Sequence, residues 1–133
     1  MSNVLLATDA DWIRDDVQAA LADETTQVSR VHRGDEVLEA IRAVGPDLVI
    51  LDMQIGNMGG IATCHAIRLE EGAGRLDPVR VMLLLDRADD RFLARTAQAD
   101  GWVVKPVEGF MLRRTALQVI AGEWAEAPAS ALA

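Results

Sequence analysis

The sequence has 133 residues, half of them hydrophobic, and a net charge of −8 from 21 acidic and 13 basic side chains. This length and composition predict one folded domain with its own core. The acidic balance and the scattered arginines argue against nucleic-acid binding, which needs a basic patch. A single cysteine excludes an internal disulfide and fits a reducing compartment. With no signal peptide and no apolar run near the roughly 20 residues of a membrane span, we expect a soluble, cytoplasmic protein.

Apolar runs alternate with segments of helical periodicity, which is typical of βαβ units. A helix is predicted after each predicted strand; the strands are 3–8, 26–32, 47–52, 79–85 and 101–105. The second helix is predicted to stop at Gly45-Pro46. The apolar faces predicted for the first three helices are Ile13, Val17, Ala20 and Leu21, then Val37, Ala40, Ile41 and Val44, then Ile61, Cys64 and Ile67. The fourth helix is predicted from about Asp89 to Ala99 and the last from about Glu108 to Trp124.

Five strands and five helices in alternation predict an α/β fold with a doubly wound parallel sheet. The second strand is the most polar and suits an edge of that sheet. The domain is predicted to occupy residues 1–124, and the Ala- and Pro-rich residues 125–133 are predicted to be a flexible tail. Trp12 and Trp124 are interpreted as packing residues.

Charged side chains stand at the ends of three predicted strands. Asp9 follows the first strand, Asp52 ends the third, and Lys105 follows the apolar part of the fifth. In an open parallel sheet, binding sites lie outside the carboxyl ends of the strands. Two acids and a lysine at matching strand ends therefore predict a phosphate or metal site.

Three stretches match a known family closely: Pro46–Met53 (PDLVILDM), Met58-Gly59-Gly60 and Gly101–Pro106 (GWVVKP). On these stretches the chain resembles, over about residues 3–122, the receiver domain of bacterial two-component response regulators. The resemblance implies a flavodoxin- or CheY-like fold, with a five-stranded parallel sheet in the order 2-1-3-4-5.

The resemblance also implies the chemistry of the site. Asp52 matches the residue that accepts a phosphoryl group from a histidine kinase or a phosphotransfer protein, and Lys105 matches the lysine that pairs with the phosphoryl oxygens. Asp9, Asp52 and the backbone carbonyl of Gln54 match the ligands of a Mg²⁺ ion, which prefers oxygen donors. The bond between Lys105 and Pro106 matches one that is cis in the family.

Three positions depart from the family pattern, and a fourth carries the switch aromatic. Thr8 stands where an acid is usual, which is expected to weaken the metal site without abolishing it, because Thr8 can hold a metal-bound water. Leu85 stands where a Ser or Thr hydroxyl binds the phosphoryl group and switches the domain. Trp102 occupies the position of the switch aromatic, and we expect it to be uncoupled from Asp52. Gly56 replaces a proline.

The sequence leaves two main hypotheses. The first is a phosphoaccepting receiver, a signalling protein rather than an enzyme; the second is a pseudo-receiver, a protein-binding module that works without phosphorylation. A third reading is an intermediate that passes the phosphoryl group on. One helix and a tail use up the residues after Pro106, so we expect no DNA-binding output domain. Output is expected through contact with an unidentified target protein, and a homodimer is expected through the face formed by the fourth helix, fifth strand and fifth helix.

Overall fold

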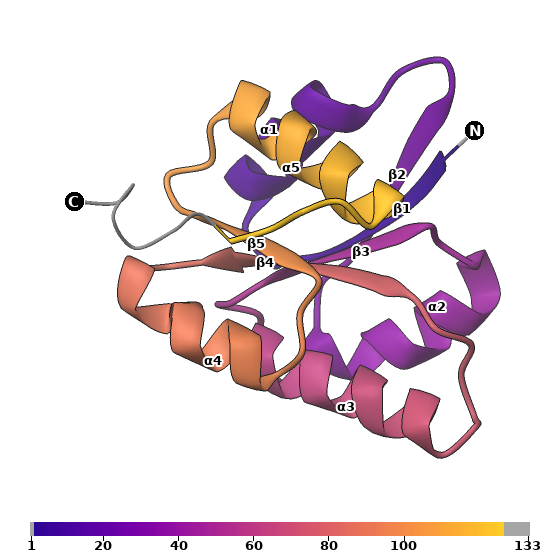
Figure 1. Ribbon diagram of the computed structural model, residues 1–133. Coiled ribbons are helices and arrows are strands. Elements are labelled where there is room, and N and C mark those ends of the chain that lie inside the picture. Colours follow the sequence, from indigo (N-terminus) through magenta and orange to yellow (C-terminus); the bar gives the residue numbers. More distant parts are fainter. Residues whose placement is uncertain (1, 127–133) are drawn as a thin grey trace.

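The structure is a computed structural model that describes residues 2–126, and it has a central sheet between two layers of helices (Figure 1). The strands are β1 (Ser2–Ala7), β2 (Thr26–Val31), β3 (Leu48–Asp52), β4 (Arg80–Leu85) and β5 (Gly101–Val104). The α-helices are α1 (Asp11–Leu21), α2 (Val37–Val44), α3 (Gly60–Gly72), α4 (Arg91–Thr96) and α5 (Gly109–Ala121). Short 3₁₀ turns, Gly34–Glu36 and Ala88–Asp90, precede α2 and α4.

The five strands are all parallel and pair in the order β2-β1-β3-β4-β5, as predicted. β3 lies in the middle, and all five of its residues are buried. The sequence of such a strand is an almost continuous apolar run, because helices cover both of its faces. β2 lies at an edge and is only partly buried, which confirms the interpretation of its polar sequence.

The core consists of two apolar layers, one on each face of the sheet (Figure 1). Successive residues of β3 point to opposite faces, so Leu48 and Ile50 lie in one layer and Val49 and Leu51 in the other. The first layer is covered by α1 and α5, and the second by α2, α3 and α4. Because all five strands are parallel, the carboxyl ends of β1, β3 and β5 lie along the same border of the sheet.

Several local predictions were wrong. Trp12 is 56% exposed, because it lies one residue, or about 100° of helix rotation, from Ile13 on the buried stripe of α1. Val44, in the last turn of α2, is exposed as well. α4 is shorter than predicted at both ends, because its first turn is 3₁₀ and because Gln98, with φ of 64°, takes the left-handed conformation soon after Thr96. α5 ends at Ala121, since Gly122 takes the left-handed conformation with φ of 73°.

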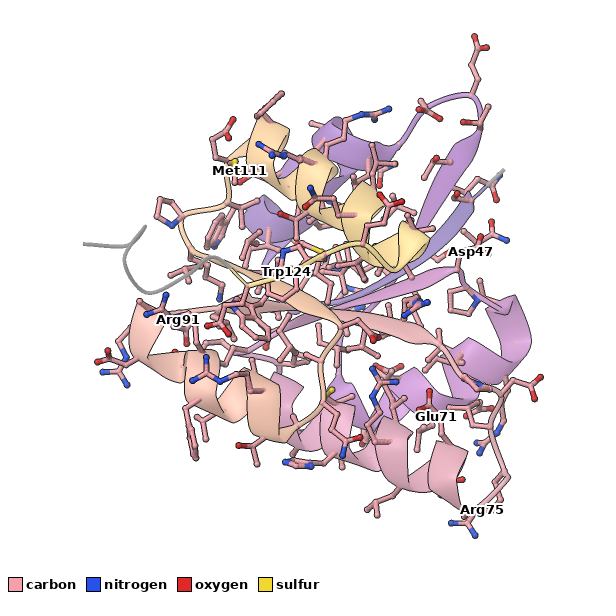
Figure 2. The ribbon with its side chains drawn as sticks, in the orientation of Figure 1. Asp47, Glu71, Arg75, Arg91, Met111 and Trp124 are labelled. Carbon is pink, nitrogen blue, oxygen red and sulfur yellow. The ribbon has the colours of Figure 1, made fainter. Side chains whose placement is uncertain are left out.

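The chain after α5 turns back and runs beside β5 (Figure 1). The rings of Trp124 and Trp102 pack edge to face, with centroids 4.6 Å apart and an interplanar angle of 63°. Glu126 Oε1 lies 2.6 Å from Nη1 of Arg95 on α4. In Figure 2, Trp124 lies near the middle of the view, with Met111 on α5 above it and Arg91 on α4 to its lower left. The first part of the predicted tail therefore contacts the domain, and residues 127–133 lie outside the described residues.

Arg68 on α3 bonds residues just before β4 and β5, at the amino ends of these strands and away from the predicted site. Its Nη2 donates to Asp100 Oδ2 at 2.8 Å, its Nε to the Gln98 carbonyl at 3.0 Å and its Nη1 to the Val79 carbonyl at 2.9 Å. Burial lowers the pKa of Arg68, but the hydrogen bonds with Asp100 and Glu71 outweigh this effect and raise it. No helix within residues 2–126 is long and apolar enough to cross a membrane.

Candidate functional site

Asp52 is the last residue of β3 and is 1% exposed. Three donors surround its carboxylate. Lys105 Nζ donates to Oδ1 at 2.6 Å, the amide of Gln54 donates to Oδ1 at 3.0 Å, and Thr8 Oγ1 donates to Oδ2 at 2.7 Å. A carboxylate offers about four lone-pair sites. Three are used here, and the remaining one is on Oδ2.

Thr8 follows β1 and is fully buried. Its hydroxyl donates to Asp52 and accepts from the amide of Ala10 at 3.1 Å, so its single proton is committed to the carboxylate. The sequence predicted that Thr8 would hold a metal-bound water. That stays a prediction, and the structure places the hydroxyl directly against Asp52.

Asp9 is exposed and leans toward the loop after β3. A Cβ added to Gly56 would lie 3.2 Å from Asp9 Oδ2, which is tighter than most contacts of this kind. Gly56 stands where a proline was expected, and its lack of a side chain leaves room for the Asp9 carboxylate. The departure at Gly56 and the position of Asp9 are therefore linked.

The oxygen donors at this strand edge are of the kind that Mg²⁺ prefers. Within residues 2–126, no group of three or more His, Cys, Asp or Glu side chains is arranged to hold a metal. Mg²⁺, however, commonly uses only one or two carboxylates and keeps several waters. The open lone pair on Asp52 Oδ2, the Asp9 carboxylate and the Gln54 carbonyl are oxygen donors of the required kind. Their role as ligands stays a prediction.

Lys105 bridges two carboxylates. Its Nζ donates to Asp52 and also to Asp86 Oδ1 at 2.8 Å, and the Lys105–Pro106 bond is cis. Burial lowers the pKa of Lys105, but the hydrogen bonds with both acids outweigh it and raise that pKa. Burial raises the pKa of Asp86, but the hydrogen bonds from Lys105 and Gln54 outweigh it and lower that pKa. Both groups are consequently ionised at neutral pH.

Asp86 is a site residue that the sequence analysis did not identify. It directly follows β4, and its Oδ2 accepts from Gln54 Nε2 at 2.6 Å. Its position at the end of a parallel strand was the available signal, because that is the criterion that selected Asp9 and Asp52.

Leu85 and Trp102 belong to the apolar layer beneath α2, α3 and α4. Leu85 is fully buried, and Trp102 is 8% exposed. A leucine has no donor for an anion. The position that carries the switch hydroxyl in the family is thus part of the apolar core in this chain.

Arg30 is a second residue that sequence reasoning missed. From β2 its Nε donates to the Thr8 carbonyl at 2.9 Å, and its Nη1 donates to Asp11 Oδ1 at 2.7 Å. The hydrogen bond and charge of Arg30 hold the pKa of Asp11 below its usual value. Asp11 bonds Arg30 rather than Asp52. Arg30 therefore fixes the turn that carries Thr8 and Asp9.

Comparison with known proteins agrees with this geometry. The chain is 36% identical over 113 residues to the transcriptional regulatory protein CseB of Streptomyces avermitilis, covering 84% of this chain and 46% of that protein. It is 27% identical to the nitrate/nitrite response regulator NarL of Escherichia coli, covering 92% and 56%. The chain spans about half the length of these curated relatives.

Solved structures share the fold. The chemotaxis response regulator CheY4 of Vibrio cholerae superposes with a TM-score of 0.79 at 25% identity, covering 90% of this chain and 98% of that one. A LuxR-family response regulator from Aurantimonas superposes with a TM-score of 0.81 at 22% identity, covering 99% and 94%. The profile of the response regulator receiver domain matches residues 4–116. The chain therefore belongs to the response regulator receiver domain family.

Proposed function

We propose that this chain accepts a phosphoryl group on Asp52 and signals through contact with another protein. The observation that carries the proposal is the Asp52 carboxylate at the end of β3, with Lys105 Nζ 2.6 Å away. A histidine kinase or a phosphotransfer protein is the proposed donor. The chain spans about half the length of its curated relatives. Any activity that such a relative has as a whole protein is therefore only proposed for this chain.

The chemistry follows from the donors around Asp52. A carboxylate oxygen attacks the phosphorus of a phosphohistidine in line, an O–P bond forms, and the P–N bond breaks with its electron pair leaving on the imidazole. Lys105 supplies a positive charge and a hydrogen-bond donor for the phosphoryl oxygens. Asp9, Asp52 and the Gln54 carbonyl would hold Mg²⁺, which supplies charge neutralisation when bound.

Phosphorylation with a small donor tests this assignment. Phosphoramidate and Mg²⁺ should add one phosphoryl group to the wild type, measured by intact-mass spectrometry, and none to Asp52→Asn. Asp47→Asn is a matched control, because Asp47 is an exposed acid just before β3 whose carboxylate bonds the Asn3 amide. An adduct that survives Asp52→Asn would show that another group is the acceptor.

A pseudo-receiver is the second candidate, and Leu85 favours it. Because this buried leucine cannot donate to a phosphoryl oxygen, phosphorylation makes little differential contact with two conformations of the domain. With a beryllofluoride mimic, we then expect amide chemical shifts to change near Asp9, Asp52 and Lys105 and to change little along α4. Large shifts at Trp102 and along α4 would favour a conventional switch.

The output contact is part of the same proposal. A homodimer through α4, β5 and α5, which the sequence analysis also predicted, would meet Trp124 and Glu126 on that face. Sedimentation of the wild type with and without beryllofluoride measures whether such a dimer forms.

A further inference from the structure

Four residues at the mouth of the site form a closed ring of hydrogen bonds, which we call the Asp86 ring. Lys105 Nζ joins Asp52 to Asp86, Gln54 Nε2 donates to Asp86, and the Gln54 amide donates back to Asp52. The ring joins the residues after β3, β4 and β5. It leaves Lys105 shared between two carboxylates.

The Asp86 ring lies on the same side of the Asp52 carboxylate as Lys105. Lys105 is the basic side chain that bonds Asp52 and would pair with a phosphoryl group there, and one of its protons is committed to Asp86 at 2.8 Å. A phosphoryl group on Asp52 would bring further negative charge beside the Asp86 carboxylate. Two like charges within a few ångströms of each other repel appreciably, even at a high effective dielectric constant.

We infer that Asp86 is a resident anion that competes with the phosphoryl group for Lys105, so that phosphorylation of Asp52 requires Asp86 to be displaced. The inference rests on the proposed function and deepens it, since it assigns control of the phosphorylation site to a residue beside it. Asp86 is a positioning residue, because it acts through Lys105.

The exchange is a change of hydrogen-bond partner and involves no further covalent step. Lys105 passes from an Asp86 oxygen to a phosphoryl oxygen, and the Asp86 carboxylate turns to water. Its side chain is already 26% exposed and lies on the loop after β4, so the displacement needs no change in the core. Gln54, which is exposed, can follow Asp86 or remain over the site.

The first test measures the affinity for beryllofluoride in the presence of Mg²⁺. A hydrogen bond to a charged group corresponds to about a 10–100-fold change in an equilibrium constant. Because Asp86 is partly exposed, we expect the lower part of this range, about tenfold tighter binding, for both Asp86→Asn and Asp86→Ala. Asp89→Asn removes the same charge from an exposed position three residues along and should leave the affinity unchanged.

A second readout does not depend on affinity. The side-chain amide of Gln54 donates to Asp86, so its NMR signals should move in Asp86→Ala. They should move in a similar direction when beryllofluoride is added to the wild type. A merely structural role for Asp86 predicts no agreement between these two directions of change. Gln54 signals that do not move when beryllofluoride is added would overturn the inference.

The outcomes separate the inference from the proposed function. If Asp52 is phosphorylated in every variant and both Asp86 variants bind beryllofluoride as the wild type does, the competition is refuted and the receiver function stands. If the wild type and both Asp86 variants bind no beryllofluoride and gain no phosphoryl group, the proposed function fails and the inference fails with it. Tighter binding in Asp89→Asn as well would assign the effect to net charge and refute a specific role of Asp86.

Discussion

Replacing Thr8 by aspartate tests the buried contact between β1 and β3. In the wild type, the Thr8 hydroxyl donates to Asp52 Oδ2 at 2.7 Å from a fully buried position. The variant loses that donor and sets a second carboxylate against the first. It also restores the pair of acids that the family usually carries after this strand.

Both consequences have estimable sizes. A hydrogen bond to a charged acceptor is worth about 1.5–3 kcal/mol. Two carboxylates about 4 Å apart repel by roughly 4 kcal/mol at an effective dielectric constant near 20. Since the side chains can turn apart, we expect Thr8→Asp to lose about 3 kcal/mol of unfolding free energy without Mg²⁺. With Mg²⁺ bound between the acids, the affinity for the ion should rise about tenfold or more.

Urea unfolding with EDTA and with saturating Mg²⁺ measures both effects. Thr8→Val is the matched control, because it removes the hydroxyl without adding charge. We expect Mg²⁺ to stabilise Thr8→Asp more than the wild type, and Thr8→Val no more than the wild type. The reasoning would be refuted if Thr8→Asp were as stable as Thr8→Val in EDTA, or if Mg²⁺ stabilised the two variants equally.

Three further predictions concern the supporting structure. A Cβ on Gly60 would lie 2.6 Å from the Asp52 carbonyl oxygen, so Gly60→Ala should lose about 1–3 kcal/mol in urea unfolding, and Gly59→Ala, with 3.6 Å to its nearest neighbour, clearly less. Burial raises the pKa of Cys64 from 9.0 to about 11. The unfolding free energy should therefore fall as the pH rises from 9.0 through about 11, and Cys64→Ala should flatten this fall. Trp124→Ala should lower the unfolding free energy by about 1–3 kcal/mol, and a value near zero would contradict the observed ring packing.

The parts of the fold that depend on local pattern were predictable from the sequence. Apolar runs such as Leu48–Leu51 and the helical periods between them fix the order of strands and helices. Parallel strands then place residues such as Asp52 and Lys105 at the same edge. Only the direction of each strand decides which edge its last residue reaches, so an error of one or two residues in a strand boundary leaves the site in the same place.

Contacts that depend on the reach of long side chains were not predictable in this way. Asp86 bonds Lys105 because two strand ends are neighbours and the lysine is long enough to serve both. Arg30 crosses from β2 to the Thr8 carbonyl, a contact set by packing between strands. Trp124 was assigned to packing correctly, but its partner depends on the turn at Gly122.

The two ends of α4 are attached differently. At the carboxyl end, Cys64 Sγ donates to the Ala97 carbonyl at 3.3 Å and Arg68 Nε donates to the Gln98 carbonyl. At the other end, the Asp90 carboxylate accepts from the amide of Arg87, three residues before it. α4 is therefore fastened to α3 where it ends, and it begins close to the loop that carries Asp86.

A short rigid rod held at one end behaves mechanically as a lever. If α4 turned as a rigid rod about its attachment near Ala97, its longest arm would lie toward Arg91. A push from the loop after β4 would then become a swing whose amplitude grows with distance from that attachment. Phe92 and Leu93, both exposed, would sweep through a wider arc than Thr96, so a small displacement at the strand edge would become a larger one on the outer surface of α4.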